Sequence, residues 1–138
     1  MKGIDHIGIA VHDLDAAIAT YSRIQNVENV YRETIATQGV EAAFIKVGKQ
    51  NIELISPINE TSPIAKFLKK RGEGIHHVAF KTKNIIKKMD KMKAQGFRLL
   101  SEKPVIGAHQ KLVCFVHPKD VHGVLIELCQ KQKKTKAE

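Results

Sequence analysis

Hydrophobic and polar residues alternate along a segment near the start of the chain, a pattern typical of a β-strand with two different faces. Within residues 4–11, Ile7, Ile9 and Val11 share one face, and His6 shares the other face with small residues. We expect the branched face to pack against a helix, and the small residues beside His6 to leave room for a ligand.

A second segment, residues 76–82, resembles the first at an offset of 71 residues, which aligns His6 with His77. In this strand Val78 and Phe80 share the helix-facing side with His76, and His77 lies on the other side. The alternation therefore selects His77, and not His76, as the partner of His6.

The offset also relates two predicted helices, about residues 13–25 and 84–95. Asp13 and Asn84 are the expected N-caps, because each can accept a hydrogen bond from a free amide of the first turn. Each half then ends on a strand with a Glu between apolar residues, Glu53 in the first half and Glu127 in the second. Each Glu interrupts a strand that is otherwise apolar.

Each half is predicted to have the order β-α-β-β-β. The remaining strands are expected at residues 27–37 and 40–47 in the first half and at 98–101 and 112–116 in the second, with Gly107 in a loop. We predict an α+β fold in which two such modules, about residues 3–57 and 74–129, form a single domain over residues 1–130. A linker, 58–73, carries a short helix at about 62–70, and the basic tail 131–138 is expected to be disordered.

His6, Glu53, His77 and Glu127 need a joint explanation. A single His in a strand is usually a core residue with its hydrogen bonds satisfied, but a buried unpaired Glu is costly. One divalent metal ion held by all four side chains explains the repeated pattern, and the alternative is two buried His–Glu hydrogen-bonded pairs. The mixed nitrogen and oxygen donors suit Co, Mn, Ni, Zn or Mg.

Composition narrows the function. Hydrophobic residues make up 43% of the 138 residues, enough for a core, and the formal net charge is +9. Nineteen Lys against four Arg, with no Trp, argue against nucleic-acid binding and are compatible with an anionic substrate. No apolar run approaches the roughly 20 residues of a membrane span, and no signal-peptide pattern is present. We expect a cytoplasmic protein without a membrane partner, with Cys114 and Cys129 reduced and buried.

The order His, Glu, His, Glu on two modules resembles the vicinal oxygen chelate superfamily, which includes glyoxalase I, extradiol dioxygenases, antibiotic-resistance proteins and the methylmalonyl-CoA epimerases. Finer motifs are similar to the epimerases, and the resemblance covers residues 3 to 129. These motifs lie at residues 4–11, 62–68, 74–77, 107–109 and 117–128. The resemblance implies a curved mixed sheet around one divalent ion held by His6, Glu53, His77 and Glu127, an acyl-CoA substrate, and a homodimer.

The resemblance also implies interconversion of (2R)- and (2S)-methylmalonyl-CoA, by removal of the α-proton, formation of an enolate and return of a proton from the other face. Glu127 is implied as one acid/base, and Glu53 is our candidate for the other. In some epimerases a Gln stands at the position of Glu53 and a Glu at the position matching Ala42. Glu41 is adjacent, but one residue along a strand reverses the face, so the second base stays open.

Other residues are candidates for substrate contacts. Gln38, His109 and Lys111 lie in or near loops and are expected near the substrate carboxylate. A basic group at residues 66–71 is either a site for the CoA phosphates or a solvated helix face. A glyoxalase I-like lyase or a non-catalytic binding module on the same fold are the alternative functions; an extradiol dioxygenase fits less well, because it uses iron with two His and one carboxylate.

Overall fold

A computed structural model of the chain describes residues 2–132, in which eight strands form one mixed sheet. The strands are β1 Ile4–Ala10, β2 Tyr31–Ile35, β3 Val40–Val47, β4 Gln50–Pro57, β5 Gly74–Lys81, β6 Val105–Ile106, β7 Leu112–Val116 and β8 Leu125–Gln130. Their order across the sheet is β2-β3-β4-β1-β5-β8-β7-β6. Of the predicted tail 131–138, residues 133–138 lie outside the described residues.

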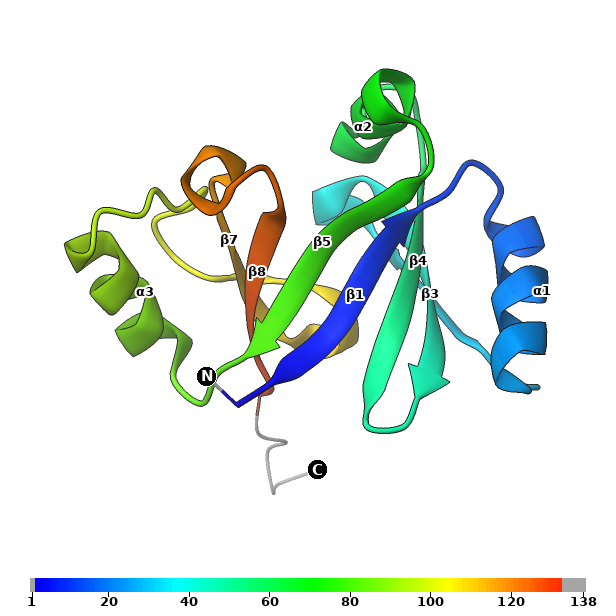
Figure 1. Ribbon diagram of the computed structural model, residues 1–138, viewed down its shortest axis with the longest axis horizontal. Helices are drawn as coiled ribbons and strands as arrows, with labels where there is room; N and C mark the ends of the chain where they lie inside the picture. The colour runs from blue at the N-terminus through cyan, green and yellow to red at the C-terminus, as the bar shows by residue number, and fades with distance from the viewer. Residues whose placement is uncertain (1, 133–138) are drawn as a thin grey trace.

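The two halves of the sheet meet at its centre (Figure 1). There β1 pairs with β5 in the antiparallel direction. Each of these strands is flanked on its other side by the closing strand of its own half, since β4 runs parallel to β1 and β8 parallel to β5. The predicted α+β fold, with two β-α-β-β-β modules in a curved mixed sheet, is confirmed.

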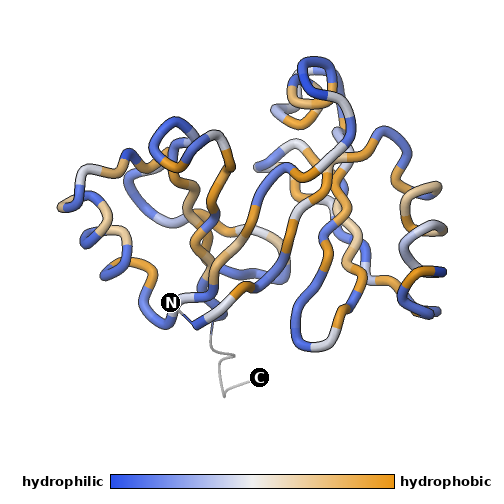
Figure 2. The backbone as a smooth tube through the Cα atoms, in the orientation of Figure 1, coloured by the Kyte–Doolittle hydropathy of each residue, from blue (hydrophilic) through white to orange (hydrophobic). Residues whose placement is uncertain are grey.

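Three helices accompany the sheet: α1 Leu14–Gln25, α2 Pro63–Arg71 and α3 Ile85–Ala94. The predicted N-caps are confirmed, because Asp13 accepts a hydrogen bond from the amide of Ala16, and Asn84 accepts one from the amide of Lys87. Both caps satisfy an amide that has no partner within its helix. The amphipathic helices alternate between hydrophilic and hydrophobic residues along the tube in Figure 2.

The core has three parts, which together leave one polar region inside. On the outer face, α1 packs against β3 and β4 around Leu54, and α3 packs against β7 and β8 around Leu128. On the inner face, α2 inserts Ile64 and Leu68 against Ile55 of β4. Because α2 covers only one end of the inner face, the other end is free for polar side chains.

We expected one face of each of the two central strands, β1 and β5, to pack against a helix, and this expectation is only partly right. Ile9 and Val11 join the cluster beneath α1, but Ile7 is only half-buried. Val78 and Phe80 of β5 are also half-buried, because α3 lies over β7 and β8 and not over β5.

The strand predicted at residues 98–101 is wrong. Leu99 forms only an isolated bridge with Val116, and the strand that pairs with β7 is the two-residue β6. The reason is a polar contact outside the sheet. Arg98 donates hydrogen bonds from its backbone amide and its guanidinium to the carboxylate of Asp120, each at 2.8 Å. This contact holds the start of the segment at the short helix η3, Pro118–Val121, so that the segment meets the end of β7 through an isolated bridge with two backbone hydrogen bonds and does not form a regular strand.

The strand predicted at residues 27–37 is shorter, as β2. At its start, Asn26 ends α1 in the left-handed conformation, with φ of 53°, and Val27 turns inward to pack beneath α1. At its end, residues 36–38 form the short helix η1, Ala36–Gln38. Within residues 2–132 no helix is long and apolar enough to cross a membrane.

Candidate metal centre

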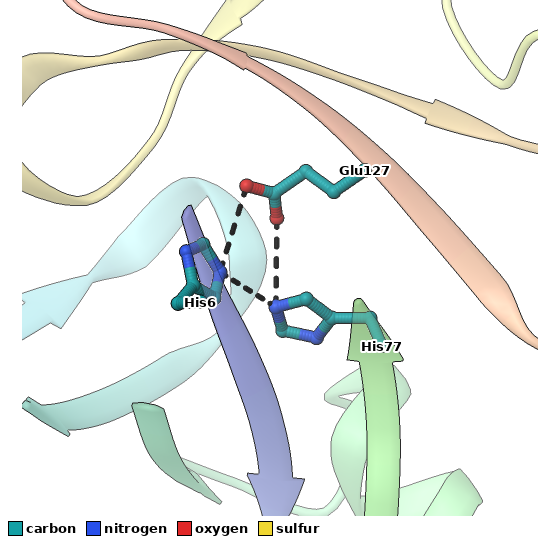
Figure 3. Close-up of side chains that lie close together, drawn as sticks. All are labelled: His6, His77 and Glu127. Atoms are coloured by element: carbon teal, nitrogen blue, oxygen red, sulfur yellow. Dashed lines mark hydrogen bonds and ion pairs between the residues drawn. The ribbon is translucent and has the colours of Figure 1, made fainter. Parts of the chain in front are cut away.

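The four predicted ligands meet at the open end of the inner face. His6 comes from β1, Glu53 from β4, His77 from β5 and Glu127 from β8, which are the four central strands. All four side chains are buried, each residue between 3% and 6% exposed. Figure 3 shows His6, His77 and Glu127 pointing toward one another.

Donor atoms of His6, His77 and Glu127 all lie within 4.8 Å of one another, and Glu53 lies beside both imidazoles. The Nε2 atoms of His6 and His77 are 2.9 Å apart. Glu53 Oε1 lies 3.1 Å from His77 Nε2 and 3.3 Å from His6 Nε2. The oxygens of Glu127 lie farther out, Oε2 at 3.7 Å from His6 Nε2 and Oε1 at 3.6 Å from His77 Nε2. Each Glu therefore faces both imidazoles, which does not fit two separate His–Glu pairs.

These spacings fit a divalent ion. Two ligands at right angles around an ion, with bonds of about 2.1 Å, have donor atoms about 3.0 Å apart. The three shortest spacings, 2.9, 3.1 and 3.3 Å, are close to this value. Two imidazoles and two carboxylates also leave positions for water or a substrate oxygen on an ion that prefers more than four ligands.

Asp5 orients the first imidazole. Its Oδ2 lies 2.7 Å from His6 Nδ1, and its two oxygens lie 3.1 and 2.9 Å from Lys111 Nζ. A hydrogen bond from Nδ1–H to this carboxylate directs the lone pair of Nε2 into the centre. The alternation did not predict Asp5, because a β-bulge between Ile4 and His6 turns it toward the face of its neighbour.

Gly8 makes room for the second imidazole. A Cβ atom on Gly8 would lie 2.0 Å from Cε1 of His77, its partner across the β1–β5 pair. The space expected beside His6 for a ligand is therefore partly filled by the ring of His77. His76 supplies no donor to the centre, but it does not point away from His77 as the alternation predicted. A register shift in the β1–β5 pair lies beside it, its ring packs edge-on against Phe67 of α2 at 4.9 Å, and its Nδ1 lies 2.9 Å from Nδ1 of His77.

The buried charges shift one another's pKa values. Burial lowers the pKa of His6, but hydrogen bonds with Asp5 and Glu53 and the charge of Glu127 outweigh burial and raise this pKa to about 10. Burial raises the pKa of Glu53, but hydrogen bonds with both imidazoles bring it well below its usual range. Burial raises the pKa of Glu127, and the imidazoles only partly oppose the shift. A cation at the centre would compete with protons for the imidazole nitrogens.

A cavity opens beside the centre. Gln38, His109 and Lys111, the three predicted substrate-contacting residues, line it together with Glu53 and Glu127.

Asn51 and Cys129 also line this cavity and were not predicted. Each lies two positions from a predicted ligand on the same strand, Asn51 from Glu53 and Cys129 from Glu127. Residues two apart share a face, so the alternation carried enough information to find them.

His109 holds the loop that contains it against strands β2 and β3, beside the cavity. Its backbone is left-handed, with φ of 57°, and its amide donates to Glu33 Oε1 at 3.0 Å. The imidazole stacks on Tyr31 at 4.6 Å and meets the edge of Phe44 at 4.4 Å between ring centroids. No pattern in the sequence indicates Glu33 or Tyr31 in this position.

Neither candidate position on β3 supplies a carboxylate to the centre. Ala42 is fully buried, and Glu41 pairs with Arg32 on the opposite face, at 3.1 Å. The basic group at residues 66–71 lies on α2, with its charged side chains exposed, and lines neither cavity near the centre.

Residues 5–115 match the family described as Glyoxalase/Bleomycin resistance protein/Dioxygenase superfamily. The chain belongs to this superfamily. Its relatives include an ethylmalonyl-CoA/methylmalonyl-CoA epimerase of Cereibacter sphaeroides, 43% identical over 129 residues, with 92% of this chain and 96% of the relative covered. The superfamily resemblance expected from the motifs is confirmed.

Solved structures of superfamily members agree with this assignment. The methylmalonyl-CoA epimerase of Mycobacterium tuberculosis superimposes with a TM-score of 0.93 at 39% identity, covering 99% of this chain and 92% of that one. A variant of the Streptomyces coelicolor methylmalonyl-CoA epimerase, in complex with 2-nitronate-propionyl-CoA, gives a TM-score of 0.92 at 37% identity, covering 96% and 99% of the two chains.

Proposed function

We propose that this protein is a methylmalonyl-CoA epimerase that interconverts the (2R) and (2S) forms of its substrate. The observation that carries the proposal is a buried centre of two His and two Glu beside a cavity, in a chain similar over almost its whole length to epimerases. A related epimerase binds a nitronate derivative of propionyl-CoA, and such an anion resembles the enolate expected in this reaction.

His6, Glu53, His77 and Glu127 would hold one divalent ion, with Co, Mn, Ni, Zn and Mg as the candidates. When bound, such an ion stabilises negative charge on an adjacent thioester oxygen. Asp5 keeps the ring of His6 oriented toward the centre, and the burial of all four side chains excludes water from around the developing charge.

Glu127 and Glu53 are the proposed acid/base residues. The α-proton lies between a thioester and a carboxylate, so its removal gives an enolate, and its return from the other face inverts the centre. A positioned acid or base commonly contributes about 10²–10⁴-fold to such a step. Glu53 directs Oε1 at both imidazoles, which leaves Oε2 as its proton-accepting atom. Gln38 and His109 are proposed to contact the substrate carboxylate from the cavity wall.

The decisive experiment incubates the metal-loaded protein with (2R)-methylmalonyl-CoA in deuterated water. We expect the (2S) form to appear with deuterium at the α-carbon. If no deuterium enters with any of the candidate metals, the epimerase proposal is wrong. Turnover of the hemithioacetal of methylglyoxal and glutathione would then indicate the glyoxalase I-like alternative, and binding without turnover would indicate a non-catalytic module.

We also propose a cytoplasmic homodimer. The apolar side chains of Ile75, Ile106 and Val124 are exposed in the single chain, at 62%, 43% and 43%, and burial of such surface favours association. Light scattering coupled to size-exclusion chromatography should give twice the mass of one chain, and the mass of a single chain would contradict the dimer.

A further inference from the structure

A second, wider cavity adjoins the first and is lined by lysines. They come from separate parts of the chain that meet where several strands begin or end on the same side of the sheet. They are Lys2 before β1, Lys49 in the β3–β4 turn, Lys81 and Lys83 at the end of β5, and Lys131 after β8. The ends of these strands lie along the lower edge of the view in Figure 1. Five positive charges from four places in the sequence thus converge on one hollow.

These charges have little compensation within residues 2–132. Lys111, which lines the same cavity, is paired with Asp5 at 2.9 Å. The described part of the chain offers the other five lysines no carboxylate within 4.0 Å. Lys83 lies so close to Lys2 that their contact, with a smaller effect of burial, lowers the pKa of Lys2. An anion between two such ammonium groups would relieve their repulsion.

The lysine cavity shares part of its lining with the cavity beside the metal centre. Both are lined by Asp5, Asn51, His109, Lys111 and Cys129. A long ligand with its reactive end at His6 and Glu53 would pass these shared residues to place its other end among the lysines. An acyl-CoA has this form, with the thioester at one end and the phosphates at the other.

We propose that the lysine cavity binds the phosphates of the coenzyme A portion of the substrate, and that Lys49 and Lys83 hold them from opposite sides. This inference rests on the proposed function for the identity of the ligand, but its chemistry can be tested without turnover. Lysine is suited to the role, because its ammonium group is a compact charge with three donors on a flexible stem.

The basic group on α2 is the matched control. Lys69 and Lys70 are exposed and line neither cavity. They lie in the last turn of α2, where positive charge interacts favourably with the helix dipole. Replacing them changes the net charge as much as replacing two cavity lysines, but at a different place on the molecule.

The experiment compares Lys49→Gln/Lys83→Gln with Lys69→Gln/Lys70→Gln, using calorimetric titration with coenzyme A, which has no acyl group to react. We expect coenzyme A to bind the wild type and the control with similar affinity, and the cavity variant at least about 10-fold more weakly, because each hydrogen bond to a charged group contributes substantially. Circular dichroism melting curves check that both variants fold. Absence of coenzyme A binding by the wild type, equal affinity of the cavity variant, or equal weakening by the control would overturn the inference.

Kinetics separate this inference from the proposed function. With methylmalonyl-CoA, we expect the cavity variant to raise KM much more than it lowers kcat, and with methylmalonyl-pantetheine, which lacks the nucleotide, we expect a far smaller effect. Epimerisation with an unchanged KM for methylmalonyl-CoA would refute the phosphate site and keep the epimerase. Coenzyme A binding that depends on Lys49 and Lys83, without any epimerisation, would keep the phosphate site and refute the epimerase.

Discussion

The replacement Gly8→Ala tests whether His77 can reach its metal-binding position only because Gly8 has no side chain. The new Cβ would lie 2.0 Å from Cε1, 2.4 Å from Nδ1 and 2.6 Å from Nε2 of His77. Carbon atoms in contact are normally about 3.5–4.0 Å apart, so the ring must move by about 1.5 Å. Metal–ligand distances tolerate only about 0.2 Å. The displaced imidazole can then no longer share a centre with His6.

We expect this variant to bind metal at least about 10-fold more weakly and to lose about 1–3 kcal/mol in free energy of unfolding from overpacking. Metal affinity is measured by competition with a chromophoric chelator, and stability by urea unfolding of the metal-free protein. The replacement does not require an unusual backbone, because Gly8 is not among the residues with positive φ.

A double variant isolates the cause. In a His77→Ala background the ring that the new methyl group would strike is absent, so Gly8→Ala should have almost no effect on the free energy of unfolding. This non-additivity is the signature of a direct contact. Wild-type metal affinity in Gly8→Ala, or an equal loss of stability in both backgrounds, would refute the reasoning.

Further replacements separate the roles of neighbouring residues. Asp5→Asn should weaken metal binding by about 10–100-fold in the chelator competition, because the carboxylate that orients His6 is lost; unchanged affinity would contradict this role. His77→Ala should remove most of the metal found by elemental analysis, whereas His76→Ala should mainly lower Tm, because its ring packs on α2; equal metal loss would contradict the alternation. Glu127→Gln should slow deuterium exchange by about 10²–10⁴-fold while coenzyme A still binds, and rapid exchange would exclude it as an acid/base.

The sequence predicted the four residues of the centre because strand periodicity is simple and local. Side chains two apart share a face, so the aligned positions of His6 and His77 on central strands were enough to bring them together. Asp5 could not be found in this way, because a β-bulge depends on pairing with a distant strand. The false strand at residues 98–101 has a similar cause, since Arg98 is drawn to Asp120, 22 residues away.

Substrate-facing residues were partly predictable for a related reason. Those on strands, such as Asn51, follow the same alternation as the ligands. Those on loops depend on side-chain contacts across the molecule, such as the stacking of His109 on Tyr31. Such contacts have no periodicity that a single sequence reveals.

The arrangement of the centre makes its integrity a property of the whole chain. His6 and Glu53 belong to the first half, and His77 and Glu127 to the second, so each half on its own offers a cation only two donors. An ion at this place would act as a cross-link that joins the halves beside the β1–β5 junction. Separately produced halves should therefore bind the ion weakly until they reassociate. The metal affinity of the mixture would then measure how completely the two halves have come together.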